Sequence, residues 1–225
     1  MADVPLAPSE LVSLLADQFA GSPSLTTGTY HLLSGAGTVA LNPIAESVVQ
    51  AAFLGLERDG TVRLERAPKS TFFGLRKSHT VLAELAGDAG SAALGAVETG
   101  LLDALRSGRA EVDEVVYIWF GENQMWPQID VMARVRDGLV ARGAVERTMT
   151  EEKGFLRTKT EVAFTLPDAT QAALAAADAE ALRALLADAG GRPDFRETLR
   201  AEVRQGLMRR VDRGGGSGNG GEWPG

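Results

Sequence analysis

The chain of 225 residues contains no cysteine and only two histidines, His31 and His79. The absence of cysteine excludes disulfides, thiolate metal sites and cysteine nucleophiles. Neither histidine has a second metal-ligating residue at helical spacing, so we interpret each as an ordinary surface or packed side chain. The sequence therefore predicts neither a metal site nor any other cofactor.

The familiar catalytic motifs are missing as well. The chain has no His-Glu-x-x-His, Gly-x-Ser-x-Gly or Gly-x4-Gly-Lys-Ser/Thr pattern. The glycine-rich stretch 34–37 is followed by no nearby basic residue or helix start, which favours a tight turn over a phosphate cradle. Glu151 and Glu152 are adjacent on an expected turn, which indicates a solvated tip and not a pair for acid–base catalysis. We predict that the protein is not an enzyme.

Long apolar runs are also absent. No stretch of roughly 18 or more apolar residues occurs, so no segment is expected to span a bilayer. The first residues, MADVPLAPSEL, lack the basic and apolar regions of a secretory signal. With 44% hydrophobic residues the chain can still bury a sizeable core. These features predict a cytoplasmic protein, and the abundance of alanine and arginine indicates a GC-rich bacterial genome.

Negative charge is in excess but is unevenly distributed. The net charge is −7, yet residues 57–81 and 134–159 each carry +3, which leaves −13 for the remainder. A chain this acidic is a poor generic binder of nucleic acid, because electrostatic forces are long-ranged and its net negative charge repels the phosphates. The two basic segments form one anion-binding face or are simply two solvated hairpins, and the composition alone leaves both interpretations open.

Hydrophobic periodicity predicts a mainly α-helical fold with short β-hairpins. The strongest helical signal begins with Asn42 as the expected cap and Pro43 in the first position, and residues 44–56 are apolar on nearly every face. We expect this helix at the centre of the fold, surrounded by amphipathic helices. The other predicted helices begin at Ser9 and near Ser78, span Ser91–Ser107, Glu111–Phe120, Pro127–Arg142 and Asp168–Ala189, and continue from Pro193.

Three hairpins are predicted between these helices. A small one lies within residues 29–41, and a second begins with the strand Thr61–Arg66. The third has a strand at Ala144–Arg147, a turn at Thr150–Gly154 and a returning strand at Phe155–Phe164. The second and third hairpins each follow an apolar helix, so we predict two winged-helix-like helix-plus-hairpin units.

The end of the chain has a different composition. Residues 214–225, GGGSGNGGEWPG, have no apolar periodicity and are expected to form a disordered tail. Residues 1–213 are predicted to form a single domain. Removal of the tail is therefore expected to leave the melting temperature unchanged.

The order of these segments resembles the Golgi phosphoprotein 3 family, whose domain also occurs in many actinobacterial proteins. The likeness covers roughly residues 6–210 and is greatest in four passages. These passages are LAPSELVSLLAD (the opening helix), SVVQAAFLGLERDGTVRLE (the central apolar helix), VMARVRDGLVARGAVER (an arginine-rich helix) and TEEKGFLRTKTEV (the following hairpin).

The resemblance implies a helical, non-enzymatic, peripheral membrane protein. Eukaryotic members of the family bind phosphatidylinositol 4-phosphate, recruit the cytosolic tails of Golgi glycosyltransferases and insert an apolar hairpin tip into the bilayer. The implied function is therefore an adaptor that binds anionic lipid headgroups on the inner face of a membrane, together with the cytosolic tails of membrane proteins. Neither the lipid, the protein partner nor the oligomeric state follows from the sequence.

The family's lipid pocket is only partly matched in this sequence. Its headgroup arginines correspond to positions near Ser47, Ile129 and Met132, and Arg134 is the arginine that remains, one turn further on. Tyr30 and His31 stand where the family has a tryptophan. The match to the phosphoinositide pocket is therefore weaker than the match to the fold.

The hairpin tips supply the remaining candidate site. Phe155 and Leu156 are the candidate membrane-inserting residues, because cations that face anionic headgroups flank them. The second hairpin repeats the pattern with Phe72 and Phe73, and two such tips on one face are expected to reinforce each other in membrane binding. The alternative is that Phe155 and Leu156 pack on the protein's own core. The candidate lipid-binding cations are Arg134, Arg157, Lys153, Lys159, Arg76 and Lys77.

A second function remains open, namely a winged-helix module that binds nucleic acid or protein. Recognition of a nucleic-acid groove requires several basic or amide side chains on one helix face. The helix predicted at 127–142 offers only Arg134, Arg136 and Arg142, which fall on different faces. We therefore expect an anionic membrane lipid and not nucleic acid as the partner.

Overall fold

The computed structural model describes residues 5–33, 35, 37–71, 76–87, 93–121, 125–153, 158–188 and 192–209. Over these residues the protein is a mixed α/β structure with eight helices and small antiparallel sheets. Within the same residues, no helix is long and apolar enough to cross a membrane. The predicted combination of many helices with antiparallel hairpins is confirmed at this level of detail.

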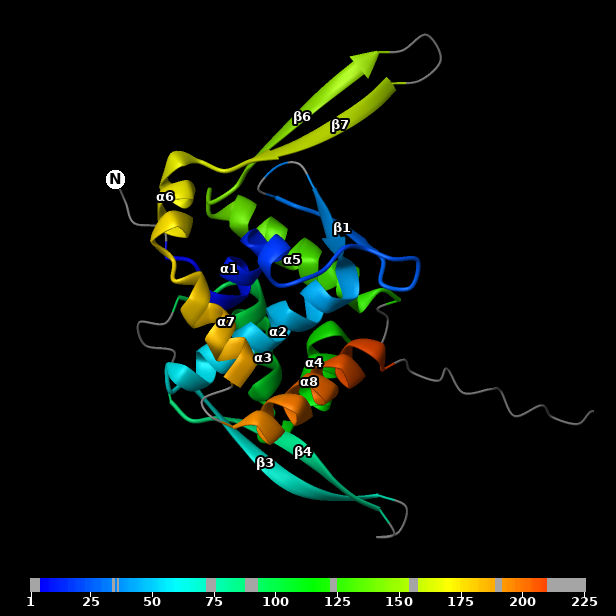
Figure 1. Ribbon diagram of the computed structural model, residues 1–225, viewed down its shortest axis with the longest axis vertical. Helices are drawn as coiled ribbons and strands as arrows, with labels where there is room; N and C mark the ends of the chain where they lie inside the picture. The colour runs from blue at the N-terminus through cyan, green and yellow to red at the C-terminus, as the bar shows by residue number, and fades with distance from the viewer. Residues whose placement is uncertain are drawn as a thin grey trace, which may run out of the picture.

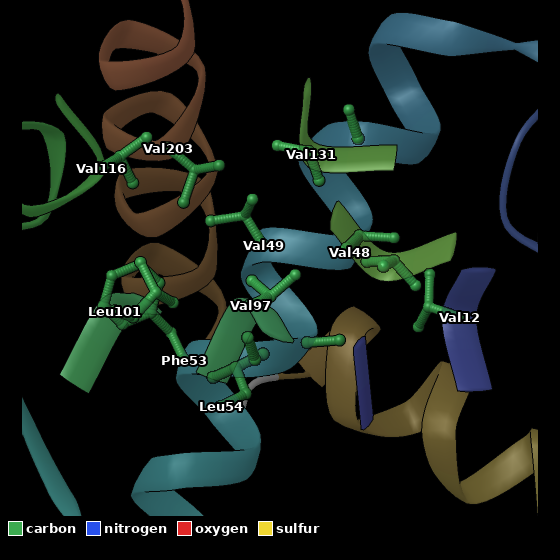
Figure 2. Packing of buried hydrophobic residues seen from close by; sticks show 14 of the residues in the cluster. Val12, Val48, Val49, Phe53, Leu54, Val97, Leu101, Val116, Val131 and Val203 are labelled. Atoms are coloured by element: carbon green, nitrogen blue, oxygen red, sulfur yellow. The ribbon is translucent and has the colours of Figure 1, made fainter. Parts of the chain in front are cut away.

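Helix α2 (Leu41–Arg58) is the centre of the core, as its sequence predicts. Every residue from Val48 to Leu56 is buried. Figure 2 shows the reason: Val48 and Phe53 of α2 lie among apolar side chains from helices on several sides. The helices that contact α2 are α1 (Pro8–Leu14), α3 (Ala96–Leu105), α5 (Pro127–Ala141), α7 (Ala179–Asp188) and α8 (Pro193–Met208).

The start of α2 differs from the prediction in one respect. The helix begins at Leu41, directly after the short strand β2 (Thr38–Ala40), and it has no side-chain cap. The Asn42 side chain instead donates a hydrogen bond to the Thr26 carbonyl at 3.4 Å, and its backbone N–H donates to the Thr27 carbonyl at 3.0 Å. Asn42 therefore ties the preceding loop to the central helix. The predicted small hairpin is confirmed, since β1 (Thr29–His31) pairs with β2.

The second hairpin is longer than predicted and replaces a predicted helix. Strand β3 (Val62–Thr71) pairs with β4 (Arg76–Leu85), and β5 (Ala110–Glu111) pairs with the other edge of β4. The helix predicted near Ser78 is therefore wrong. Val81 and Ala83 are buried whereas Leu82 and Glu84 are only partly buried, and this alternation within a ten-residue ladder outweighs the helical preference of the Leu-Ala-Glu-Leu sequence.

The third hairpin is confirmed, but its turn comes later. Strand β6 (Glu146–Lys153) pairs with β7 (Thr158–Thr165), so most of the predicted turn at Thr150–Gly154 belongs to β6. The connection at 154–157 lies outside the described residues. The hairpin follows α5 just as β3 and β4 follow α2, which reproduces the predicted order of helix and hairpin.

The remaining helices agree with the sequence apart from their boundaries. α4 (Val112–Phe120) ends at Gly121, whose φ of 73° suits glycine. The helix predicted at Asp168–Ala189 is two helices, α6 (Asp168–Ala176) and α7. The break is at Asp178, whose carboxylate accepts a hydrogen bond from the Ala181 N–H at 2.9 Å and so caps α7.

The two long hairpins extend from opposite ends of the molecule (Figure 1). β3 and β4 project from one end of the longest axis, and β6 and β7 project from the other, with the helices between them. The expectation that the two hairpins present their tips on one face is therefore wrong. The reason is that each hairpin continues from the C-terminal end of its helix, and the C-terminal ends of α2 and α5 lie toward opposite ends of the molecule.

Candidate functional site

Arg134 is the predicted headgroup residue whose side chain the structure describes, and its contacts lie within the protein. Its Nε is 3.0 Å from Asp130 Oδ2, one turn earlier on α5. Its guanidinium also lies 5.3 Å from the centre of the Trp119 ring and 5.4 Å from that of Phe120. Arg134 therefore joins α5 to the end of α4, and a role in lipid binding stays a prediction.

The hairpin cations are placed only through their backbone. Arg76 pairs with Thr71 in the β3–β4 ladder, and Lys77 is the next residue of β4. Lys153 and Lys159 belong to β6 and β7 at the other end of the molecule. The structure thus separates the predicted cations into two groups at a distance from each other. Arg157, Phe155 and Leu156 lie outside the described residues.

A different surface gathers exposed apolar side chains. Among the described residues, nine large hydrophobic side chains are exposed, and five of them line one hollow of about 550 Å³. We call these five the apolar cluster. Soluble proteins rarely expose apolar groups together, and such patches mark sites of contact with another surface. The cluster consists of Leu25, Met125, Trp126, Ile129 and Met208.

Three segments that are distant in sequence supply this cluster. Leu25 comes from the loop before β1, Ile129 from the first turn of α5 and Met208 from the end of α8. The ends of the two helices are tied, since the Gln128 side chain donates to the Leu207 carbonyl at 3.4 Å. The start of α2 completes the wall. The hollow is therefore built on helix ends and not on a single loop.

Leu25 is the most exposed member and is held by local hydrogen bonds. It occupies a four-residue turn in which the Ser24 N–H donates to Thr27 Oγ1 at 2.9 Å and the Thr27 N–H returns to the Ser24 carbonyl at 3.2 Å. Its side chain is fully exposed. A leucine fixed in water at the tip of a closed turn gains nothing from the protein itself. This arrangement suits contact with an external apolar phase.

The sequence contained only a weak signal for this surface. Met125 and Trp126 are adjacent apolar residues in a predicted loop, and Leu25 lies in a stretch rich in glycine, serine and threonine. Ile129 and Met132 lie about one turn apart on the helix predicted at 127–142, yet Ile129 is 53% exposed and Met132 is 2% exposed. Periodicity shows which residues share a face, but not how far neighbouring elements cover it.

A second cavity, of about 860 Å³, shares Met208 and Arg209 at the end of α8 with the first. It is lined by charged residues that include Lys69 of β3 and Asp113 of α4. Behind it is Glu202 of α8, which is 6% exposed. Burial and the nearby charge of Asp113 raise the pKa of Glu202 to about 7, against the opposing effects of the Thr80 hydroxyl and Lys69.

This raised pKa predicts a pH dependence of stability. The folded protein holds the Glu202 proton more tightly than the unfolded chain does, so the free energy of unfolding falls as the pH rises from the unfolded value toward about 7. In Glu202→Gln this loss is absent. In buffer free of divalent cations, we expect the free energy of unfolding of the parent to fall by about 2 kcal/mol relative to that of the variant between roughly pH 5 and pH 8. Urea denaturation at each pH measures the difference, and parallel pH profiles would contradict it.

The function must be inferred from this geometry, because no protein-family model, curated protein or solved structure matches the chain.

Proposed function

We propose that the protein is a non-enzymatic, peripheral membrane adaptor that inserts the apolar cluster into the surface of an anionic membrane. The observation that supports this proposal is the gathering of Leu25, Trp126, Ile129 and two methionines around one hollow. Tryptophan in particular suits the boundary between water and lipid, where one part of the ring is apolar and its N–H remains hydrated.

The magnitudes favour reversible attachment. Burying one such side chain contributes about 1–3 kcal/mol, and the cluster offers several. Arg209 also lines the hollow, but its guanidinium lies 3.7 Å from Asp113 Oδ2, so it adds less than the roughly 1 kcal/mol of a free cation near an anionic surface. The net charge of −7 opposes approach to the same surface. Apolar insertion therefore dominates the expected affinity, and stable residence requires a second contact.

The hairpin β6–β7 is the proposed second contact. Its predicted tip, Phe155 and Leu156, has the same combination of apolar groups and cations, and the hairpin projects well beyond the helices (Figure 1). The cytosolic tail of a membrane protein remains the proposed partner at the membrane, as the family resemblance implies. Because the hollow has Ile129 where the family has a headgroup arginine, we propose insertion of apolar groups in place of a specific phosphoinositide pocket.

The winged-helix alternative receives less support. We propose the two winged-helix-like units because α2 is followed by the hairpin β3–β4 and α5 by the hairpin β6–β7. The hairpins extend in opposite directions, which places their basic segments at opposite ends of the molecule. This separation does not favour a single nucleic-acid surface.

Co-sedimentation with vesicles tests the membrane proposal. The parent is compared with Leu25→Ser/Trp126→Ser on vesicles of neutral lipid, of phosphatidylserine and of phosphatidylinositol 4-phosphate. Loss of two inserting side chains is expected to lower binding to the anionic vesicles at least about tenfold. Leu85→Ser/Ile118→Ser is the matched control, because these residues are 45% and 43% exposed and lie outside the apolar cluster. The control is expected to bind as the parent does.

A third variant separates the two proposed contacts. Phe155→Ser/Leu156→Ser is expected to weaken binding to anionic vesicles independently of the cluster. If the parent binds no vesicle, or if the Leu25/Trp126 variant binds as well as the parent, insertion of the apolar cluster is wrong. Binding that depends on Phe155 and Leu156 alone would assign the membrane contact to the hairpin.

A further inference from the structure

Three carboxylates from separate segments converge beside the larger cavity. Glu111 is the residue before α4, Asp113 is in the first turn of α4, and Glu202 is on α8. One oxygen from each lies within 4.8 Å of the others. Asp113 and Glu202 are only 4% and 6% exposed, so these are not ordinary surface acids.

Several oxygens at this position have no hydrogen-bond partner. Asp113 Oδ1, Glu202 Oε2 and the hydroxyl of Thr80 on β4 are buried and form no hydrogen bond with any of the described residues. Thr80 is 3% exposed and near enough to lower the pKa of Glu202. A buried polar atom without a partner costs roughly 1–3 kcal/mol, and more when it is charged. Such a set of oxygens is expected to hold a proton or a cation.

We propose that Glu111, Asp113, Glu202 and Thr80 form a binding site for a divalent cation of the size of calcium. The ligands are all oxygens, as a hard cation prefers. Oxygens that bind one Ca²⁺ lie roughly 2.3–2.6 Å from it, so two ligands are at most about 5 Å apart. The three carboxylate oxygens lie within 4.8 Å of one another, which is inside this range. Mg²⁺ demands near-ideal octahedral geometry at roughly 2.1 Å, whereas Ca²⁺ accepts irregular sets of oxygen ligands.

The surroundings support such a site. Glu111 and Asp113 line the open cavity of about 860 Å³, which gives an ion a path from solvent and room for the waters that complete its coordination. The other oxygen of Asp113, Oδ2, accepts a hydrogen bond from the Gln205 side chain at 2.8 Å. Arg209 lies 3.7 Å from the same oxygen. These contacts fix the carboxylate so that Oδ1 is the oxygen left for a cation.

Lys69 is the group that a cation must compete with. Its ammonium pairs with Glu111, and its side chain is 29% exposed. Burial lowers the pKa of Lys69, but the hydrogen bond and charge of Glu111 raise it overall, so the lysine is a resident positive charge. Lys69 and Arg209 together face three carboxylates, so negative charge is still in excess at the site. A dication displaces the Lys69 ammonium toward the open cavity, where its charge returns to water.

Isothermal titration with CaCl₂ at about pH 8, where protons compete least, tests the site. The parent is expected to bind one Ca²⁺, and Glu202→Gln and Asp113→Asn are each expected to weaken binding at least about tenfold. Glu114→Gln is the matched control, because Glu114 lines the same cavity but is not one of the converging carboxylates. It is expected to bind as the parent does. MgCl₂ is expected to bind more weakly.

Lys69→Gln distinguishes a cation site from a structural ion pair. If the cation competes with the ammonium, this variant binds Ca²⁺ more tightly than the parent does. If Lys69 and the carboxylates form only an ion-pair network, the variant loses stability and binds no Ca²⁺. Absence of Ca²⁺ binding by both the parent and Lys69→Gln, with a melting temperature unchanged by CaCl₂, would overturn the proposal and leave a proton as the occupant.

Discussion

Val48→Asp is expected to destabilise the protein by several kcal/mol, about 3–5 or more. Val48 is completely buried in α2, and its neighbours in the core are apolar (Figure 2). An aspartate there loses the apolar contacts of valine and either carries a buried charge or takes up a proton, and both states cost free energy. Since a domain of this kind has only about 5–15 kcal/mol of stability, much of the variant is expected to be unfolded at 37 °C.

Thermal and urea denaturation followed by circular dichroism measure this loss. The matched control is Ile118→Asp, which introduces the same charge on a helix where the side chain is 43% exposed. The control is expected to change the free energy of unfolding by less than about 1 kcal/mol. Equal melting temperatures for the two variants would show that α2 is not the centre of the core.

Arg142→Met is the second change with a large expected effect. Glu10 on α1 is completely buried, and both of its carboxylate oxygens lie 2.5 Å from an Arg142 nitrogen at the end of α5. Removal of the arginine leaves the carboxylate buried without a cation. Breaking such a pair from one side costs about 3–5 kcal/mol.

The surroundings of Glu10 increase this cost. Glu98 is 1% exposed and accepts hydrogen bonds from the backbone and hydroxyl of Ser9, at 3.1 Å and 2.7 Å. Burial raises the pKa of Glu98, the Ser9 hydrogen bonds lower it, and the charge of Glu10 raises it. Arg142 is the cation that pairs with this group of acids in the part of the chain that the structure describes. Without it, α1 is expected to separate from α5 first.

Two comparisons make the Arg142 result specific. Arg106→Met breaks a pair with Asp103 in which both side chains are mostly exposed, and it is expected to cost less than about 1 kcal/mol. In the parent, the Glu10 carboxylate accepts a hydrogen bond from the Ala7 N–H at 2.9 Å. Glu10→Gln combined with Arg142→Met removes the unpaired charge, and the glutamine amide oxygen can still accept this hydrogen bond. This double variant is expected to recover most of the lost stability. If Arg142→Met lowered the free energy of unfolding as little as Arg106→Met does, this result would contradict a buried ion pair between Glu10 and Arg142.

The central helix was predictable because its signal is local. Apolar residues on nearly every face of 44–56 require cover on every side, whatever the other elements are. The strand β4 was not predictable in the same way, because its conformation depends on a ladder with β3. The break at Asp178 was missed for a different reason. Alanine is compatible with an unbroken helix, and only the capping hydrogen bond to Ala181 reveals the boundary.

The two candidate sites, the apolar cluster and the three carboxylates, could not be predicted from local sequence patterns. Glu111 and Asp113 are close in sequence, but Glu202 joins them only because α8 packs against α4. Likewise, Leu25 and Met208 lie at opposite ends of the chain and meet only at the hollow. Local patterns identify elements, whereas these sites depend on which ends of those elements meet.

The position of α2 has a consequence for how the protein is made. α2 ends at Arg58, yet one of the helices that covers it, α8, begins at Pro193. During synthesis the apolar face that α8 covers is therefore exposed to water while more than half of the chain is still being added. Exposed apolar surface of this kind promotes aggregation. The nascent chain is accordingly expected to depend on chaperones, and the core closes only after α8 leaves the ribosome.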